Sequence, residues 1–466
     1  MMRPRSDASR DSASSRVAAV RQLRRASVLV VGDAMLDRYV YGRVSRVSAE
    51  APVPILAIER ETAVPGGAAN VVRNLTALGA ASAFVSVVGD DQPGADLTGL
   101  VGGQPGVEPW LLVQGGRATT TKTRFVAAGQ QILRADREQA SPIHPRLADR
   151  LVRIASDALA ATRAIVLSDY HKAVLAADVA PRLIELARKS GRKVVVQPRA
   201  GELERFEGSD LVVLESDRAL AAPGTPPPEA SASADAALEL LRRHRFGAVL
   251  VVRGSQGLTL VTGAEAPRHW RADASDQDDP AGAGEAVVAV MAAALAVGQP
   301  LALAAELAAA AIGIVSRKVG IAVVREDELA EAFTPGFRAR QKLVSLPFAS
   351  AIAERWRHRG WRIGLLHLAA GGAARWTPAL LEQARSWCDR LIICICDDAA
   401  TVLADSPLVD LVAHCEGQSN EALLRLFRPD VLVHGPDAVP LGHDDENLLS
   451  EWGGALHRPD LATAAE

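Results

Sequence analysis

Short apolar runs rich in β-branched residues alternate with alanine- and leucine-rich stretches from Ser27 onward. Near-continuous apolar strands separated by helices predict a parallel sheet that is covered by helices on both faces. Helical patterns such as AANVVRNLTALG and VAPRLIELARKSG separate several of the runs, and each ends near a glycine. The predicted strands are residues 28–33, 83–90, 164–170, 193–198, 210–214 and 248–254. The sequence therefore predicts an α/β fold.

Four further segments define the predicted domains. Residues 43–67 contain three prolines and no helical period, which predicts a small β flap between the first strand and the first helix. Residues 334–348 are the predicted linker, because a second and shorter α/β pattern follows over 349–466. That pattern predicts a smaller, Rossmann-like domain after a first domain at 23–333. The polar residues 1–22 predict a disordered lead.

Composition excludes several classes of protein. A net charge of -3 and a pI near 6.4 favour neither nucleic acid nor a membrane surface as partner. The most apolar stretch, residues 286–315, is interrupted by Gly-Gln-Pro and Glu306, which predicts two buried helices rather than a membrane span. The cysteines match no zinc signature and predict free core thiols, no metal site and a cytoplasmic location. They are Cys388, Cys394, Cys396 and Cys415.

Polar residues follow the first strand and open the first helix. Asp33 and Asp37 are placed at the carboxyl end of the first strand, where open α/β sheets bind ligands and carboxylates can pair with sugar hydroxyls. Gly66 and Gly67 would let a ligand approach the backbone, and the Asn70 amide can donate and accept. The alternatives are a helix cap with a surface aspartate, and an ordinary turn at a helix start.

A second polar group lies on strand-like segments and after the third strand. Cations in TKTR and QQILRAD could bind the phosphate of a sugar phosphate, whereas the alternative is a solvated strand face. SDYHK follows an apolar strand directly, at the same binding edge. The candidate residues are Lys122, Arg124, Gln131, Arg134, Asp169 and Lys172.

These motifs, in this order, resemble the ribokinase-type sugar kinases. The carrying segments, over about residues 23–330, include VVGDAMLDRYVYGRVSRVSAEAPVPIL, PGGAANVVRNLTALGA, TTTKTRF, LSDYHKAVL and DPAGAGE. The chain is most similar to the bifunctional ADP-heptose synthesis proteins, in which a heptose 7-phosphate kinase is fused to a heptose 1-phosphate adenylyltransferase. The resemblance implies ATP and Mg²⁺ as cofactors if the chain is active. It also implies closure of the flap over the sugar and a homodimer formed through the flap.

The turn DPAGAGE departs from that family. The family closes this turn with an Asp that acts as base, and the backbone amides of the turn bind the transferring phosphoryl group. Here Glu285 takes the place of the Asp, while Gly282, Ala283 and Gly284 keep the amide donors. A Glu has a similar pKa but extends roughly one ångström further, and such a displacement can cost about 100-fold in rate.

The nucleotide side departs further. The resemblance implies nucleotide contacts from Arg253, Gly254 and Gly257 in VVRGSQG, and from Asp279 in the DPAGAGE turn. Where the family has D-P-K after a strand, this chain has Gln197-Pro198-Arg199. Where the family has T-P-N, this chain has Leu214-Glu215-Ser216, so charges expected near phosphates and Mg²⁺ are reversed.

The second domain resembles a degenerate nucleotidyltransferase. The family depends on an H-x-G-H turn whose histidines contact the nucleotide phosphates. Spacing places that turn at residues 374–377, which are Ala-Arg-Trp-Thr. His367 lies upstream beside an apolar strand, where a structural role is the simpler interpretation. The sequence predicts that this half is inactive.

Three hypotheses follow from the sequence. The first is an ATP-dependent kinase for a sugar phosphate, with D-glycero-D-manno-heptose 7-phosphate as substrate. The second is a pseudoenzyme that binds a sugar phosphate and acts as a regulator or as a partner of an active homologue. The third, a purely structural dimer, explains the retained polar clusters least well.

Overall fold

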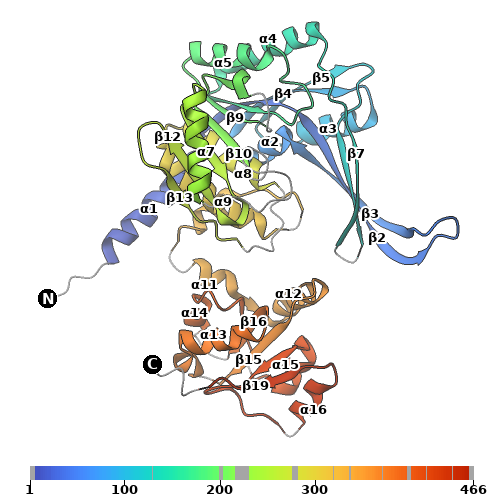
Figure 1. Ribbon diagram of the computed structural model, residues 1–466, viewed down its shortest axis with the longest axis vertical. Helices are drawn as coiled ribbons and strands as arrows, with labels where there is room; N and C mark the ends of the chain where they lie inside the picture. Colours follow the sequence, from blue (N-terminus) through green and yellow to red (C-terminus); the bar gives the residue numbers. More distant parts are fainter. Residues whose placement is uncertain are drawn as a thin grey trace. The chain divides into compact units, whose positions relative to one another are not determined.

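The computed structural model describes residues 6–127, 130–198, 203–215, 230–274, 282–318, 320–334, 337–369, 371–395, 400–415, 417–442 and 444–460. The chain divides into two compact units, Met1–Phe333 and Thr334–Glu466 (Figure 1).

A central sheet organises the first unit. Over the described residues its strand order is β13-β12-β11-β10-β9-β8-β1-β4-β5, and all neighbours from β11 to β5 pair in parallel. The strands are β1 (Ser27–Gly32), β4 (Ala81–Gly89), β5 (Val107–Gln114), β8 (Ala164–Ser168), β9 (Lys193–Gln197), β10 (Leu211–Glu215), β11 (Ala248–Val252), β12 (Leu258–Thr262) and β13 (Arg268–Trp270). The predicted strands are therefore present and parallel, because apolar β-branched runs are stable when both faces are covered.

Helices cover both faces of this sheet and form two apolar layers. One layer contains α1 (Ser6–Gln22), α2 (Ala68–Ala77), α3 (Gln92–Gly102), α8 (Ala283–Ala296), α9 (Leu301–Ser316) and α10 (Glu326–Glu331). The other contains α4 (Pro145–Ala161), α5 (Val179–Lys189) and α7 (Ala230–Arg243), with α4 and α5 at the top of Figure 1. The apolar segment predicted as two buried helices forms α8 and α9.

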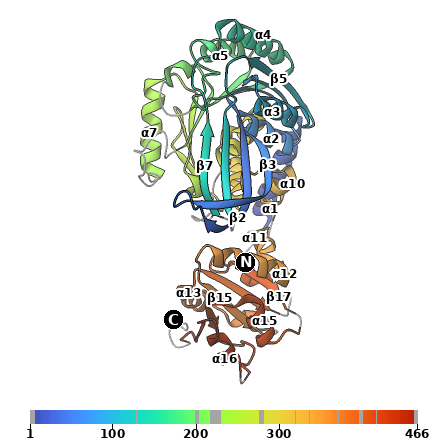
Figure 2. The same cartoon turned by 90° about the vertical axis from the view of Figure 1, so that its right-hand side faces the viewer.

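A second sheet of the first unit contains the predicted flap. Its order is β3-β2-β6-β7, and Figure 2 shows these strands side by side. The strands are β2 (Ala34–Val47), β3 (Pro54–Gly67), β6 (Thr121–Ala127) and β7 (Gln130–Arg137). The flap thus begins directly after β1, earlier than the predicted 43–67, because residues 34–42 already pair with β3. Its outer part exposes Val44, Val47, Val53 and Ile58.

Helix α1 differs from the disordered lead predicted for residues 1–22. Residues 6–22 are helical, and Val20 is fully buried. The Gln299 side-chain amide donates to the Ala19 carbonyl at 2.7 Å, and Arg16 pairs with Glu306 at 2.6 Å. The polar start of the segment hides this packing in the sequence, because only its last turn is apolar.

The second unit is a smaller parallel α/β domain, as predicted. Its described strands lie in the order β14-β17-β16-β15-β18-β19, and all pairs are parallel. They are β14 (Leu343–Ser345), β15 (Ile363–Leu368), β16 (Arg390–Ile395), β17 (Leu411–His414), β18 (Val431–Val433) and β19 (Ala455–His457). The helices are α11 (Phe337–Lys342), α12 (Leu346–His358), α13 (Pro378–Ser386), α14 (Ala400–Ala404), α15 (Asn420–Phe427) and α16 (Asp445–Ser450).

Residues 334–348 were predicted to be a linker, but the structure shows regular elements of the second unit in this segment. It contains α11, the edge strand β14 and the start of α12, and β14 pairs with β17. These short elements have too few residues to show a period, and only pairing within the second unit reveals them.

The predicted core thiols are found where the structure describes them. Cys388, Cys394 and Cys415 are buried in the core of the second unit, whereas Cys396 lies outside the described residues. In the parts of the chain that the structure describes, no helix is both long and apolar enough to cross a membrane.

Candidate active site

The first turn of α8 lies at the carboxyl edge of the central sheet. Gly282 caps the helix with φ +87°, a left-handed conformation that suits glycine, and Ala283, Gly284 and Glu285 form the first turn. The first amides of a helix have no partner within the helix and carry partial positive charge, so this turn is suited to an anion. Asp279 lies outside the described residues.

One end of this turn faces an unused donor. A Cβ placed on Gly282 would lie 3.1 Å from Asn70 Nδ2, and Asn70 is fully buried. Arg73 donates to Asn70 Oδ1 at 2.9 Å, which fixes the amide orientation. Asn70 Nδ2 has no hydrogen-bond partner among the described residues. A buried donor without a partner is costly, so this atom fits a ligand acceptor at the turn.

The other end of the turn faces a carboxylate. A Cβ placed on Gly284 would lie 2.5 Å from Glu215 Oε1 and 3.2 Å from Gln197 Nε2. Glu215 ends β10 and Gln197 ends β9, and Ser168 Oγ donates to Gln197 Oε1 at 3.1 Å. A larger residue at position 284 would therefore have to displace the Glu215 carboxylate.

The Glu285 carboxylate is held by a tyrosine. The Tyr170 hydroxyl donates to Glu285 Oε1, although the two residues are 115 positions apart. Tyr170 follows β8 directly and is 9% exposed. The longer side chain that replaces the family Asp is thus bonded to a protein group at the edge of the sheet. The separation of the two residues along the chain leaves no local sequence signal of this contact.

The Asp33 carboxylate accepts hydrogen bonds from the backbone of the loop after β8. It is fully buried, and its carboxylate accepts hydrogen bonds from the amides of Tyr170 at 2.8 Å, Lys172 at 2.9 Å and Val174 at 3.0 Å. Burial raises its pKa, although these amides act in the opposite direction. The loop contains His171 at φ +56°, a strained backbone that such bonds can hold in place. Asp33 therefore shapes the loop that presents Tyr170.

Asp37 forms a buried ion pair with Arg124. Arg124 Nη1 donates to Asp37 Oδ1, and the side chains are 2% and 15% exposed. Burial raises the pKa of Asp37 despite this guanidinium. Gly66 is required beside the pair, because a Cβ there would lie 1.8 Å from Asp37 Oδ2. Gly67 has φ +57°. The structure thus brings the two candidates of the flap sheet together.

The predicted phosphate-binding cations are also paired with acids. Lys172 Nζ lies 2.9 Å from Glu138 Oε2, and Lys122 Nζ lies 3.0 Å from Asp136 Oδ2. Arg134 Nε also contacts Asp136, at 3.0 Å. The two acids, Asp136 and Glu138, were not among the predicted site residues, and they reduce the positive charge available to a phosphate. Gln131 is exposed on β7, opposite Val126 of β6.

Asp169 has a cationic partner that the sequence analysis missed. Arg205 Nη2 donates to Asp169 Oδ2, and the His171 amide donates to Oδ1 at 3.0 Å. Asp169 is 2% exposed, so its carboxylate is held by the protein on both oxygens. The long separation of the two residues in the sequence leaves no local signal of this pair.

The predicted nucleotide residues on the β11–β12 connection form a tight turn. Arg253 donates to Gln256 Oε1 at 3.0 Å and to its carbonyl at 3.2 Å. Gly254 and Gly257 have φ +56° and +99°, and a Cβ on Gly257 would lie 2.0 Å from the Trp270 carbonyl oxygen. The glycines are therefore required by the turn itself.

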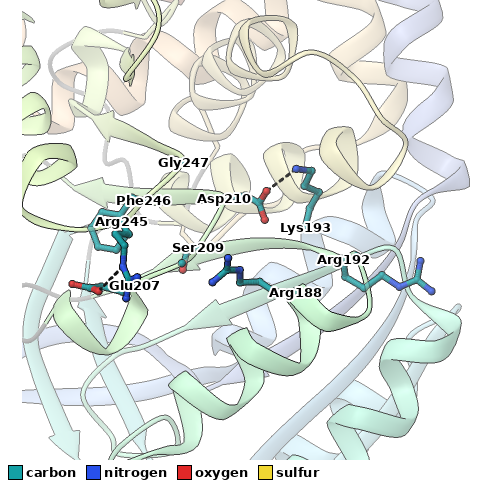
Figure 3. A pocket seen from close by; sticks show the side chains of 11 residues that line it. Arg188, Arg192, Lys193, Glu207, Ser209, Asp210, Arg245, Phe246 and Gly247 are labelled. Carbon is teal, nitrogen blue, oxygen red and sulfur yellow. Dashed lines mark hydrogen bonds and ion pairs between the residues drawn. The ribbon is translucent and has the colours of Figure 1, made fainter.

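A cavity of about 560 Å³ lies at the opposite, amino-terminal edge of β9 and β10 (Figure 3). Lys193 pairs with Asp210 at 2.6 Å, and Arg245 with Glu207 at 3.4 Å. Arg188 lies in the last turn of α5, where a cation stabilises the helix dipole. These contacts give the charges a structural role away from the α8 turn.

In the second unit, a tryptophan packs at the sheet edge where a ligand would be expected. Its strand order reverses between β15 and β18, which is the usual ligand position in such sheets. Trp376 is 5% exposed and packs on Gly435 after β18, since a Cβ on Gly435 would lie 2.6 Å from the indole Cζ2 atom. Its Nε1 donates to the Pro436 carbonyl at 3.0 Å. Trp376 occupies the segment where H-x-G-H was expected.

His367 has a structural environment. It is 3% exposed, its Nδ1 lies 2.7 Å from Asn420 Oδ1, and its carbonyl accepts from the Val439 amide at 2.9 Å. Burial lowers the pKa of His367, but interactions with Cys415, Asn420 and Asp445 outweigh burial and raise it overall. This histidine ties β15 to α15.

The family model for pfkB family carbohydrate kinases matches residues 25–326. Phosphofructokinase-2 from Escherichia coli, in its tetrameric inhibited form, has a TM-score of 0.54 and 18% identity, covering 66% of this chain and 98% of the other. Arabidopsis thaliana ribokinase, complexed with ribose and ATP, has a TM-score of 0.51 and 17% identity, covering 66% and 99%. The fold of the first unit is therefore ribokinase-like.

Relatives extend the match to nearly the whole chain. A bifunctional protein HldE from Acidiphilium cryptum is 49% identical over 96% of this chain and 95% of the relative. Another from Paramagnetospirillum magneticum is 40% identical over 96% of each. The chain belongs to the pfkB family of carbohydrate kinases and, over both units, to the bifunctional HldE proteins within it.

Proposed function

We propose that the first unit transfers the terminal phosphoryl group of ATP to a sugar phosphate, D-glycero-D-manno-heptose 7-phosphate, in the synthesis of ADP-heptose for lipopolysaccharide core. The α8 turn carries this proposal, because it combines helix amides that have no partner within the helix, the Asn70 donor without a partner among the described residues, and the Glu285 carboxylate at one edge of the sheet. Membership of the pfkB family and the HldE relatives support the substrate class.

In this proposal Glu285 accepts the proton of the attacking sugar hydroxyl. Tyr170 holds the carboxylate in place, and the amides of residues 282–284 stabilise charge on the transferring group. Asp37 with Arg124 orients the sugar at the flap sheet. Mg²⁺, bound with ATP, would neutralise phosphate charge. Closure of the β2–β3 flap would exclude water, which competes as an acceptor.

Turnover tests the kinase. We expect ATP-dependent phosphorylation of heptose 7-phosphate by the full chain, and a loss of at least about 100-fold in kcat for Glu285→Ala. Glu185→Ala, an exposed acid on α5, is the matched control and should retain full activity. If calorimetry shows that heptose 7-phosphate binds but the assay detects no phosphorylation, the kinase proposal is excluded.

One observation favours a second candidate function. Glu215 beside Gly284 places an acid next to the predicted phosphate site, while the buried contacts of Asp37 and Asn70 remain. A regulator that binds a sugar phosphate, or a partner of an active homologue, would keep the buried contacts of Asp37 and Asn70. It would not need a phosphate-transfer site that is free of acids. The same turnover experiment separates the two candidates.

We infer that the second unit lacks adenylyltransferase activity. Trp376 packed on Gly435, at the position of the expected H-x-G-H turn, supports this inference. Incubation of the full chain with heptose 1-phosphate and ATP should release no pyrophosphate. Formation of ADP-heptose would contradict it.

We also propose a cytoplasmic homodimer that pairs through the flap. The exposed Val44, Val47, Val53 and Ile58 on β2, β3 and the connecting loop supply an apolar surface for this contact. Sedimentation of wild type and Val47→Asp should show a dimer and a monomer. A wild-type monomer would contradict the proposal.

A further inference from the structure

The Glu215 side chain lies against the first turn of α8. Its Oε1 atom would be 2.5 Å from a Cβ on Gly284, and its Cδ atom 3.6 Å. Glu215 is half-buried at the end of β10, a strand that is otherwise buried. The carboxylate is therefore directed from the edge of the sheet onto the helix, and the missing side chain of Gly284 makes room for it.

The direction of this approach identifies which part of the helix it contacts. In an α-helix every Cα–Cβ bond tilts toward the amino terminus, and the unpaired amides of the first turn point the same way. Because Gly284 belongs to the first turn, an atom beside its Cβ position lies next to these amides. A phosphate bound at the amino terminus of α8 would lie close to the same amides.

The two ends of the turn offer opposite chemistry to such a phosphate. Gly282 faces Asn70 Nδ2, a buried donor without a partner among the described residues. Gly284 faces the Glu215 carboxylate, which can only accept hydrogen bonds while it is ionised. Gln197 Nε2 lies at 3.2 Å from the same Cβ position. The Gly282 end of the turn therefore fits an anion, whereas the Gly284 end already has a carboxylate beside it.

We propose that Glu215 is an internal anion that competes with the nucleotide phosphates for the amino terminus of α8 and thereby sets the affinity for ATP. The inference rests on the proposed function in one respect, namely that ATP phosphates bind at this turn. A negative charge at a helix amino terminus stabilises the helix, and a second one close by is repelled. The protein thus holds α8 in place at the expense of nucleotide binding.

Calorimetric titration with Mg-ATP tests the proposal on the full chain. Glu215→Gln keeps the shape and removes the charge, so we expect binding tighter by about tenfold or more. Glu215→Asp keeps the charge but moves it away from the helix by about the length of one methylene. Its affinity for Mg-ATP should lie between those of wild type and Glu215→Gln. Glu185→Gln, an exposed acid on α5, is the matched control and should bind as wild type does.

Each outcome decides the proposal. Equal or weaker ATP binding by Glu215→Gln overturns it, and weaker binding would mean that Glu215 helps to hold Mg-ATP. Absence of ATP binding in both wild type and Glu215→Gln also overturns it, provided that thermal unfolding shows the variant folded. If Glu215→Gln binds ATP more tightly but no variant phosphorylates heptose 7-phosphate, the kinase proposal fails and this inference stands.

Discussion

The two units present the same kind of sheet edge but different contents. In the first unit, the carboxyl ends of β1, β8, β9 and β10 meet the start of α8, and glycines keep space beside that turn. In the second unit, Trp376 packs on Gly435 at the edge between β15 and β18. The Ala369 amide also donates to the Asp437 carbonyl at 2.9 Å, which joins the two loops.

This difference shows that topology supplies only a position for a site. Both sheets have a parallel arrangement whose carboxyl edge suits a ligand. Whether a ligand fits is decided by the side chains of the loops, which pack on each other in the second unit. In the first unit, Asn70 Nδ2 is a buried donor without a partner among the described residues, which suits a ligand acceptor.

Trp376→Ala tests the packing at the edge between β15 and β18 of the second unit, and should have the largest effect on stability. Removal of a buried indole should lower the free energy of unfolding of the second unit by about 3–5 kcal/mol. Kinase turnover should not change, because Trp376 belongs to the second unit, where it contacts Gly435 and Pro436. Denaturant unfolding followed by circular dichroism measures the loss. Trp110→Ala, at a site 41% exposed, is the control, and an equal loss there would contradict the assignment.

Tyr170→Phe tests the carboxyl edge of the first unit's sheet, because it removes the hydroxyl that donates to Glu285. The hydrogen bond from Tyr170 to the Glu285 carboxylate contributes about 1.5–3 kcal/mol, so kcat should fall roughly ten- to 100-fold while sugar phosphate affinity is kept. Tyr41→Phe is the matched control, since its ring contact with Arg60 survives the change. In a Glu285→Ala background the Tyr170 substitution should have no further effect. Additive losses would show that the two residues act separately.

The smallest effect concerns pH and His367. Because its pKa is raised in the folded chain, its stabilising contribution is full below the unfolded pKa of 6.5 and is lost as pH rises through the folded value. We expect the wild-type unfolding temperature to decline from pH 5.5 to 8.5 more steeply than that of His367→Asn. Parallel curves for the two proteins would refute a titrating contact of His367 with Cys415, Asn420 and Asp445.

Much of the fold could be predicted from local patterns. The parallel strands, the buried helices α8 and α9 and the smaller second domain follow from apolar periodicity, which each segment carries within itself. The elements that were missed, α1, α11 and β14, have weak or short patterns. They are stable only through packing on distant parts of their own unit.

The candidate site divides in the same way. Sequence alone places Asp33 and Asp169 at the carboxyl edge, since residues that follow parallel strands meet there, whereas the structure brings the Gly282–Glu285 turn to the same edge. Tertiary structure decides what each carboxylate does: Asp33 binds three loop amides, Asp169 pairs with Arg205, and Glu215 lies on Gly284. The physical reason is that hydrogen bonds and charge interactions act over a few ångströms in space. They join residues whose separation along the chain leaves no periodic trace.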